Sequence, residues 1–244
     1  MEQRRLEGRL ALVTGASRGI GRAVALALAE AGAHVIITAR RVGALEDLDD
    51  EIRAGGGSAT LVKLDLTDGE KVDALGPTIY ERWGKLDVLV GNAGLLGPLS
   101  PLPHVTTDAW LAVCDVNLHA NWRLIRTCDP ILRNSDAGRA IFVTSGAAAA
   151  KRAYWGPYSV TKAALEALVK TYAHEVANSS VRVNLLNPGP TRTEMRARAF
   201  PGEDPATLPT PEEVAQLFIE LAVPEQTANG ERFDFKRANG PTPA

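Results

Sequence analysis

The sequence predicts an α/β fold in which one doubly wound parallel sheet of about seven strands carries helices on both faces. Short runs of β-branched and aliphatic residues recur along the 244-residue chain. Segments of helical length, with apolar residues three and four positions apart, separate most of these runs. Strands that alternate with helices favour parallel pairing, because each helix returns the chain to the edge of the sheet where the previous strand began.

Each short apolar run is interpreted as a buried strand. In chain order, the predicted strands cover residues 11–13, 35–38, 60–64, 88–90, 141–144, 181–186 and 233–235. The clearest helical patterns cover residues 20–31, 42–54, 107–132 and 159–177. The stretch 188–210 contains several prolines and is expected to be irregular.

The chain is expected to form a single domain over residues 1–244, because no repeat, heptad array or long linker divides it. Residues 190–210 are predicted to form a lid over a substrate site, since an irregular run of that length in a compact domain is usually functional or mobile. The tail, residues 239–244, is expected to be disordered.

Composition and charge exclude several classes of partner. A hydrophobic content of 45% and a charged content of 23% are typical of an ordinary globular protein. The formal net charge of −2 gives no basic field, so no nucleic-acid partner is expected. No membrane association is expected either, and the protein is predicted to be cytoplasmic, because residues 1–10 are charged and no apolar stretch is long enough to span a bilayer.

The residues that most often bind metals are scattered. Cys114 and Cys128 lie in predicted helix without a CxxC pair, and both are expected to be buried thiols. The four histidines form no HExxH motif and stand beside no paired carboxylates. No metal site is therefore predicted.

A glycine-rich loop directly follows the first predicted strand. Residues 14–21 read Thr-Gly-Ala-Ser-Arg-Gly-Ile-Gly and lead into the first predicted helix. Glycines there allow the backbone to turn tightly, to approach a pyrophosphate closely and to direct helix N–H groups at it. A structural turn is the alternative, but a position between the first strand and the first helix favours a dinucleotide-binding loop.

Further motifs follow the loop in a fixed order. They are Asn92-Ala93-Gly94, Asn117, Ser145, Tyr158 with Lys162, and Asn187-Pro188-Gly189 with Thr193. Together with the TGxxxGxG loop they resemble the short-chain dehydrogenase/reductase family across nearly the whole chain, and bacterial generic oxidoreductases in particular. The resemblance implies a Rossmann-type fold and an enzyme that moves hydride between a nicotinamide cofactor and a small-molecule carbonyl or secondary alcohol.

Tyr158 and Lys162 are four residues apart, which places them one turn apart on one helix face. A phenol of pKa about 10 is a poor acid–base catalyst near neutrality, so Lys162 is expected to lower the pKa of Tyr158. Ser145 ends a strand, where its hydroxyl can hold the substrate oxygen. The resemblance implies that Tyr158 donates the proton, that Lys162 also binds the nicotinamide ribose, and that Asn117 anchors a water relaying protons to Lys162.

The predicted cofactor site combines the glycine loop with the ends of later strands. It comprises Gly15, Ser17, Arg18, Gly19, Ile20, Gly21, Arg40, Asp65, Leu66, Asn92, Ala93, Gly94, Tyr158, Lys162, Pro188, Gly189, Thr191 and Thr193. Asp65 resembles the position that contacts adenine in the family, with helix capping by Asp65 or Asp68 as the alternative. Thr191 is a substitute for Thr193 as the threonine that contacts the cofactor.

The residues after the second strand predict NADP(H) as the cofactor. NAD-dependent relatives place an acidic residue there, which binds the ribose hydroxyls and repels a 2′-phosphate. Ala39 occupies that position here and Arg40 follows it. Arg18 and Arg40 are expected to bracket the phosphate with charge-assisted hydrogen bonds. The alternative is that both arginines are solvated surface charges.

The substrate pocket is expected to have mixed walls, formed by residues 95–102, 146–155 and 195–200. Apolar residues predominate among them, including Leu95, Leu96, Trp155, Met195 and Phe200. Cations also lie nearby, namely Lys151, Arg152, Arg192, Arg196 and Arg198. They either recognise an anionic group of the substrate or are solvated surface charge.

The protein is expected to be a homodimer or homotetramer. The helices predicted at 107–132 and 159–177 carry more apolar residues than one contact face requires, including Leu165, Leu168, Val169 and Tyr172. The equivalent helices of the family form a two-fold four-helix interface. A catalytically silent NADP-binding sensor or scaffold remains the second functional class, because fold and function separate easily.

Overall fold

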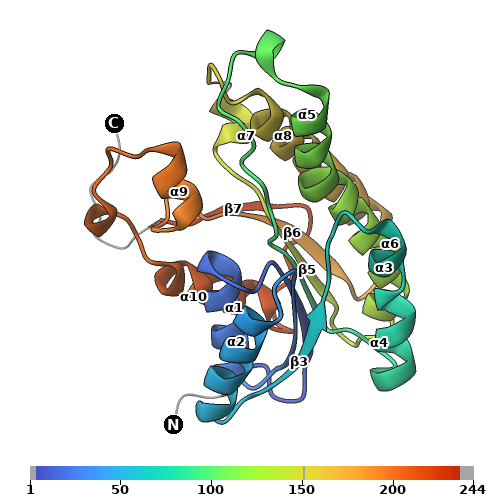
Figure 1. The fold of residues 1–244 in the computed structure, drawn as a ribbon. Coiled ribbons are helices and arrows are strands. Elements are labelled where there is room, and N and C mark those ends of the chain that lie inside the picture. Colours follow the sequence, from blue (N-terminus) through green and yellow to red (C-terminus); the bar gives the residue numbers. More distant parts are fainter. Residues whose placement is uncertain (1–3, 151, 237–244) are drawn as a thin grey trace.

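Seven parallel strands form a single sheet in the order β3-β2-β1-β4-β5-β6-β7 in the computed structural model, which describes residues 4–150 and 152–236 (Figure 1). The strands are β1 Leu10–Thr14, β2 His34–Ala39, β3 Ser58–Lys63, β4 Val88–Gly91, β5 Arg139–Val143, β6 Arg182–Asn187 and β7 Arg232–Asp234. This confirms the predicted fold class. The tail predicted to be disordered, residues 239–244, lies outside the described residues.

Helices cover both faces of the sheet (Figure 1). One face carries α1 Gly19–Glu30, α2 Gly43–Ala54 and α10 Pro211–Ala222. The other carries α3 Gly69–Asp73, α4 Leu75–Trp83, α6 Ala120–Arg133 and α8 Gly156–Glu175. The shorter elements are α5 Thr107–Cys114, α7 Ala147–Ala150, α9 Glu194–Ala199, η1 Leu102–His104, the π turn η2 Asp115–His119 and η3 Pro205–Thr207.

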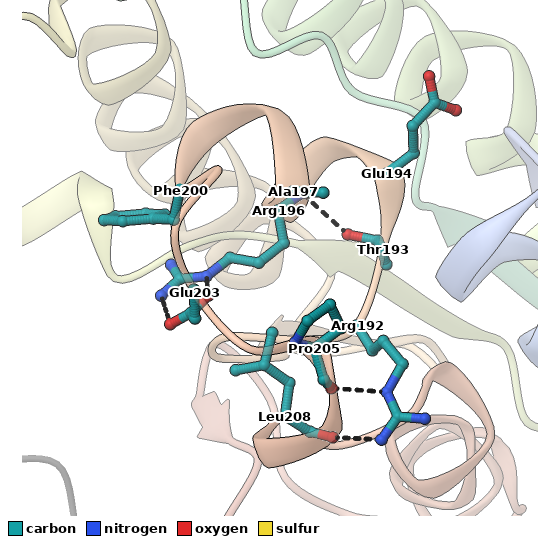
Figure 2. Close-up of a pocket in the computed structure, with 9 residues that line it drawn as sticks. All are labelled: Arg192, Thr193, Glu194, Arg196, Ala197, Phe200, Glu203, Pro205 and Leu208. Carbon is teal, nitrogen blue, oxygen red and sulfur yellow. Dashed lines mark hydrogen bonds and ion pairs between the residues drawn. The ribbon is translucent and has the colours of Figure 1, made fainter.

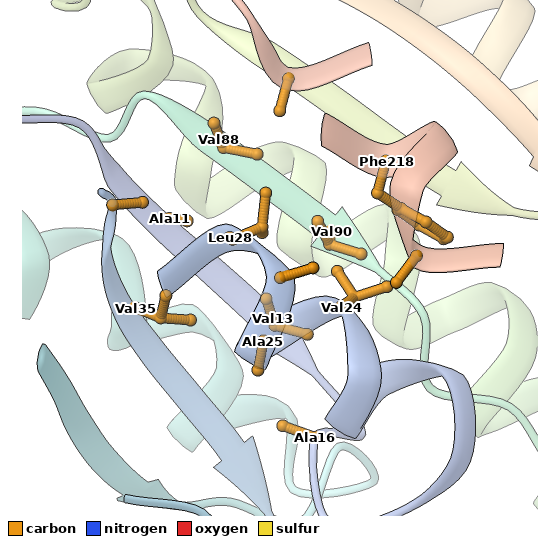
Figure 3. Close-up of a cluster of buried hydrophobic side chains, with 14 of the residues drawn as sticks. Ala11, Val13, Ala16, Val24, Ala25, Leu28, Val35, Val88, Val90 and Phe218 are labelled. Atoms are coloured by element: carbon orange, nitrogen blue, oxygen red, sulfur yellow. The ribbon is translucent and has the colours of Figure 1, made fainter. Parts of the chain in front are cut away.

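The strand side chains alternate between two hydrophobic cores. On β1, Ala11 and Val13 pack with α1 and α10, where Figure 3 shows them beside Leu28 and Phe218. Leu10 and Leu12 point to the opposite core, between the sheet and α4, α6 and α8. Because both faces are covered, the strands read as continuous apolar runs rather than as alternating patterns.

The helix predicted at 107–132 is three consecutive elements, α5, η2 and α6. The π turn η2 joins α5 and α6 directly, with no loop between them, so the sequence reads as one continuous helix. Asn117 lies in this turn, and its carbonyl accepts a hydrogen bond from Asn121 Nδ2 (2.8 Å).

The stretch expected to be irregular, 188–210, contains the short helix α9 and the turn η3. Thr193 caps α9 by accepting a hydrogen bond from the backbone N of Arg196 (3.2 Å). Pro205, one of the prolines that suggested an irregular run, begins η3. Proline fits this position because a residue in the first turn of a helix donates no N–H to the helix. The helices α3, α4 and α10 were not among those predicted.

Three of the four apolar residues assigned to an interface belong to the core instead. Leu165, Val169 and Tyr172 on α8 are buried within the chain, and Leu168 packs against the same core. Their sequence pattern therefore reflects packing against the sheet and α6, not an unused face. The prediction for the cysteines is half right, because Cys128 is buried with its pKa raised to about 12, whereas Cys114 is partly exposed.

Candidate active site

A cavity of about 420 Å³ opens where the loops after the carboxyl ends of β1 to β6 converge. Parallel sheets bind ligands at this edge, at the point where the strand order reverses. Every residue that the sequence assigns to cofactor binding lines this cavity, from Gly15 to Thr193. Of the four predicted catalytic residues, Ser145, Tyr158 and Lys162 line it, whereas Asn117 is buried outside the lining.

The glycine loop lies close to the loop after β4. Gly15 has a φ of +67°, a left-handed conformation that glycine adopts without strain. A Cβ atom on Gly21 would collide with the carbonyl oxygen of Gly15 and with the side chain of Asn92. Asn92 Nδ2 donates a hydrogen bond to the carbonyl of Thr14 (2.9 Å), which ties the two loops together. The N-cap residue Arg18 makes no side-chain capping bond, so the first N–H groups of α1 can bind an anion.

Arg18 and Arg40 reach the cavity from different loops. Arg40 follows β2, and its side chain is exposed at the cavity. Arg18 forms an ion pair with Glu194, the first residue of α9. The sequence predicts that both guanidinium groups serve one phosphate, but in the structure Arg18 is already paired with a carboxylate from the 190–210 segment. The sequence analysis expects this segment to be irregular, so it predicts no helix start at Glu194.

The two candidate capping aspartates have different roles. Asp68 caps α3 by accepting a hydrogen bond from the backbone N of Lys71 (3.2 Å). Asp65 lines the cavity and accepts hydrogen bonds from the backbone N and the Oγ1 of Thr67 (3.0 and 2.9 Å). The capping alternative therefore applies to Asp68, and Asp65 remains at the cavity.

Both candidate threonines line the cavity, but only one of them is buried. Thr191 is buried and donates a hydrogen bond to the carbonyl of Pro188 (3.1 Å). Thr193 is the N-cap of α9 and approaches Gly19 of the glycine loop. Thr193 thus joins the segment that contains α9 to the first turn of α1.

Tyr158 lies in the first turn of α8, and 8% of its surface is exposed. Burial raises the pKa of its phenol, and a hydrogen bond with Ser145 acts in the opposite direction. The expectation that Lys162 lowers this pKa is wrong for the structure. Lys162 Nζ lies 5.8 Å from the centroid of the Tyr158 ring and donates a hydrogen bond to the carbonyl of Val143 (2.7 Å) instead.

The pKa of Lys162 is also strongly shifted. Only 3% of its surface is exposed, and burial lowers its pKa from 10.5 to about 8. An ammonium in this position is poorly solvated, because the carbonyl of Val143 at the end of β5 is its one hydrogen-bond partner within the described residues. The group can therefore gain or lose a proton close to neutral pH.

Asn117 holds the loop that follows β4. Its Oδ1 accepts a hydrogen bond from the backbone N of Leu95 (2.7 Å), and its Nδ2 donates to the Leu95 carbonyl (3.0 Å) and to Thr161 Oγ1 (3.0 Å). A Cβ atom on Gly94 would lie 3.6 Å from Asn117 Oδ1 and 3.7 Å from Lys162 Nζ. Asn117 and Lys162 thus approach the same glycine, and the water relay between them stays a prediction.

The wall beside Tyr158 is mostly apolar. Of the residues predicted for it, those that line the cavity are Leu95, Leu96, Trp155, Met195, Arg196 and Ala199, whereas Phe200 lines a second, smaller cavity. The described residues of 97–102 and 146–154 lie outside the lining.

The arginines near α9 bind their own segment (Figure 2). Arg196 donates from Nε and Nη2 to the two carboxylate oxygens of Glu203 (2.5 and 2.6 Å). Arg192 donates to the carbonyls of Pro205 (2.7 Å) and Leu208 (3.4 Å) beside a second cavity of about 300 Å³. Arg196 is therefore paired with a carboxylate of its own segment rather than solvated, whereas Arg192 is exposed and bonds only carbonyl groups, so both alternatives from the sequence stay open for Arg192.

The other three cations predicted at the pocket do not reach it in the described structure. Arg152 and Arg198 are exposed and lie outside the lining, and Lys151 lies outside the described residues.

Some lining residues were missed by the sequence analysis. They are Thr38, Leu64, Val116, Val143, Thr144 and Glu194. Thr38, Leu64, Val143 and Thr144 stand at the carboxyl ends of strands that the sequence predicts, so the rule that ligands bind at these ends could have identified them. Glu194 follows the capping Thr193, and an acidic residue directly after a capping threonine is typical of a helix start.

The described residues, 4–150 and 152–236, contain neither a membrane-spanning helix nor a metal-binding cluster. No helix among them is long and apolar enough to cross a membrane. No group of three or more histidine, cysteine, aspartate or glutamate side chains among them is arranged to hold a metal ion.

Comparison with known families gives a match over most of the chain. The model of a family described as short chain dehydrogenase matches residues 9–204. The oxidoreductase YciK of Escherichia coli K12 is 37% identical over 219 residues, which are 88% of this chain and 86% of the relative. The 3-oxoacyl-[acyl-carrier-protein] reductase FabG of Vibrio harveyi is 35% identical over 228 residues, covering 90% of this chain and 92% of the relative.

Solved structures agree with the fold in detail. A short chain dehydrogenase from Shigella flexneri 2a, complexed with NADP, superimposes with a TM-score of 0.91 at 37% identity, covering 96% of this chain and 99% of the other. A short chain dehydrogenase from Escherichia coli CFT073, complexed with NADPH, gives a TM-score of 0.89 at 36% identity, covering 96% and 99% of the two chains.

Proposed function

The chain belongs to the short chain dehydrogenase family, and from this membership we propose that it is an NADP(H)-dependent oxidoreductase acting on a small-molecule carbonyl or secondary alcohol. One observation carries the proposal. A single cavity contains the glycine loop, Arg18 and Arg40 together with Ser145, Tyr158 and Lys162. A dinucleotide and a small substrate can therefore share one site.

The residues at the cavity fit a dinucleotide. Backbone approaches so closely at Gly21 that a side chain would collide there, which leaves a backbone-lined cradle suited to a pyrophosphate. Arg40 and Arg18 would bind a 2′-phosphate, and Ala39 places no carboxylate that would repel it. Asp65 would hold the adenine side and Lys162 the nicotinamide ribose. The complexes of the two solved relatives with NADP and NADPH support this assignment.

The bound nicotinamide supplies the hydride. During reduction Ser145 Oγ holds the carbonyl oxygen of the substrate, and Tyr158 donates its phenolic proton to that oxygen, which yields the alcohol. The raised pKa of Tyr158 keeps the phenol protonated, as a proton donor requires. Lys162, with a pKa near 8, returns a proton toward Tyr158 after each turnover.

We also propose that residues 190–210 act as a lid within a single domain. Glu194, Met195, Arg196 and Ala199 line the cavity, so this segment covers the site from one side. The contact between the rings of Trp155 and Phe200, 5.7 Å between centroids, joins the segment to the start of α8.

The experiment is a turnover assay combined with a binding assay. Purified protein and NADPH are mixed with a broad panel of ketones and aldehydes, and the loss of nicotinamide absorbance reports reduction. Calorimetry measures NADPH binding in parallel. Turnover of any carbonyl supports the proposal, whereas tight NADPH binding without turnover across the panel would contradict it and favour a sensor or scaffold.

A further inference from the structure

The part of the cavity beside Tyr158 has a largely apolar wall, which favours some carbonyl compounds over others. Its walls come from the loop after β4, the π turn, the start of α8 and the segment that contains α9. The apolar side chains that line it there are Leu95, Leu96, Val116, Trp155, Met195 and Ala199. Glu194 and Arg196 are the charged residues that the α9 segment adds to the lining, and both are in ion pairs.

Aromatic rings extend this wall from Tyr158 to the lid. The ring of Trp155 meets the Tyr158 ring edge-on, with 5.9 Å between centroids. On its other side Trp155 lies 5.7 Å from the ring of Phe200, the residue that ends α9. A substrate whose carbonyl oxygen is held by Ser145 and Tyr158 would place its substituents against this surface.

The cations close to this wall are already bound. The guanidinium of Arg196 pairs with Glu203 and also lies 3.7 Å from the centroid of the Phe200 ring. Figure 2 shows Arg196 directed toward Glu203, away from Thr193. Lys162 donates to the carbonyl of Val143 and is buried. Among the described residues that line this end, Arg196 is therefore neutralised by a carboxylate, and Lys162 bonds a neutral carbonyl and is assigned to the nicotinamide ribose under the proposed function.

A carboxylate that entered this space would lose its hydration, and the guanidinium of Arg196 beside it is already neutralised by Glu203, so its entry is unfavourable. An apolar substituent would lose little, because it exchanges water for apolar contacts. We infer that the substrate is an uncharged ketone or aldehyde with an apolar substituent, and that keto acids are excluded. This inference rests on the proposed function for the reacting group but concerns the charge of the substrate.

The first experiment compares two ketones that differ only in charge. With NADPH, kcat/KM is measured for methyl 4-acetylbenzoate and for 4-acetylbenzoate at the same ionic strength. The neutral ester is expected to be reduced with a kcat/KM at least tenfold above that of the acid. Equal or faster reduction of the acid would overturn the inference while leaving the proposed function intact.

A binding experiment tests the inference about substrate charge independently of the proposed oxidoreductase function. The amides methyl 4-carbamoylbenzoate and 4-carbamoylbenzoate cannot be reduced in this way, and calorimetry measures their binding to the protein saturated with NADP⁺. Binding of the ester at least tenfold tighter than the acid supports the inference even if no ketone is turned over. Equal binding, or no binding of either amide, contradicts it.

The variant Glu203→Gln tests whether the pairing of Arg196 with Glu203 causes the preference for an uncharged substrate. This variant removes the charge that neutralises Arg196, so the ratio of acid to ester kcat/KM should rise severalfold. Glu212→Gln removes an exposed carboxylate from the first turn of α10, outside both cavities, and should leave the ratio unchanged. Because each ratio is measured within one variant, a general loss of activity does not affect it. An unchanged ratio in Glu203→Gln would show that Arg196 pairing does not set the preference.

Discussion

Lys162 holds a buried ammonium group whose pKa is lowered from 10.5 to about 8. Between these two values the folded protein binds fewer protons than the unfolded chain, so its stability rises with pH across this window. Below about pH 8 both states carry the charge, and the cost of burying it is present in full. The residue that the proposed chemistry needs is therefore a source of instability at neutral pH.

Replacing Lys162 with methionine should stabilise the protein while it abolishes turnover. The gain at pH 7 should be about 1–3 kcal/mol, because a pKa shift of this size corresponds to roughly 3 kcal/mol and the bond to Val143 offsets part of it. Thermal unfolding should show Tm raised by about 2–4 °C per kcal/mol. The gain should shrink as pH approaches 10.5. Lys170→Met, on the exposed side of α8, is the control, and a Lys162→Met variant less stable than the wild type at pH 7 would contradict the argument.

Arg40 and Ala39 should decide the choice of cofactor. Without a carboxylate at Ala39, kcat/KM for NADP(H) should exceed that for NAD(H) at least tenfold, which corresponds to about 1.4 kcal/mol. Ala39→Asp combined with Arg40→Leu should erode or invert this preference, measured by steady-state kinetics with both cofactors. Equal use of both cofactors by the wild-type protein at low ionic strength would contradict the assignment.

Sequence patterns can place a residue when its position depends only on its neighbours along the chain. Gly15, Asn92 and Ser145 follow predicted strands, and the carboxyl ends of parallel strands meet at one edge, so their convergence could be predicted. The pairing of Arg18 with Glu194 joins residues far apart in the chain, and no local pattern encodes it. The raised pKa of Tyr158 also depends on burial by distant elements, which is why its direction was predicted wrongly.

At the scale of elements, a chain of polar contacts links four of them behind the site. Thr144 Oγ1, next to Ser145, donates to Glu166 Oε1 (2.7 Å), and Arg232 Nη1 donates to the same oxygen (2.9 Å). Arg232 Nη2 also donates to Asp234 Oδ1 (3.1 Å), which accepts from Asn187 Nδ2 (2.5 Å). The end of β5, α8, β7 and the last residue of β6 are thereby held together.

Arg232→Leu should loosen this arrangement. Because Arg232 and Glu166 are partly buried, loss of the pair should lower stability by about 1 kcal/mol or slightly more. Binding of NADP⁺ should weaken severalfold, since the loop that contains Pro188 and Gly189 loses its support, and calorimetry measures this. Arg232→Lys keeps the charge and should recover part of both losses. Unchanged binding in Arg232→Leu would show that the contacts are only structural.

Element boundaries were predictable where a strand or glycine marks them and not where the helical pattern continues. Residues 107–132 show no break in sequence at the π turn, which the backbone hydrogen bond from Ala120 N to the carbonyl of Asp115, five residues earlier, distinguishes from regular helix. The apolar residues of α8, Leu165 and Val169, were assigned to an interface because a sequence does not show which neighbour covers a helix.

At the scale of the whole molecule, three large apolar side chains remain exposed on α5, α6 and α8. Leu111 is 47% exposed, Trp122 44% and Val160 48%. These elements form the outer layer on one side of the sheet (Figure 1). We propose that this layer, rather than the buried residues of α8, forms the contact between copies of the chain.

Light scattering coupled to gel filtration should therefore give a mass of two or four times the 26.0 kDa chain. Leu111→Glu combined with Val160→Glu should shift this mass toward the single chain, because a charge within an apolar interface is costly. Tyr80→Glu, at an exposed position on α4, is the control. A mass of 26.0 kDa at all concentrations would contradict the proposal.

The most direct test of the proposed chemistry is the kcat of Tyr158→Phe, measured with NADPH and any ketone that the wild-type protein reduces. The substitution keeps the ring and removes the proton donor, so kcat should fall by about 10²–10⁴-fold, the range typical of general acid–base catalysis. The affinity for NADPH should change little, and Tyr154→Phe, at an exposed position nearby, should retain full activity. Near-normal turnover by Tyr158→Phe would contradict the account of this site.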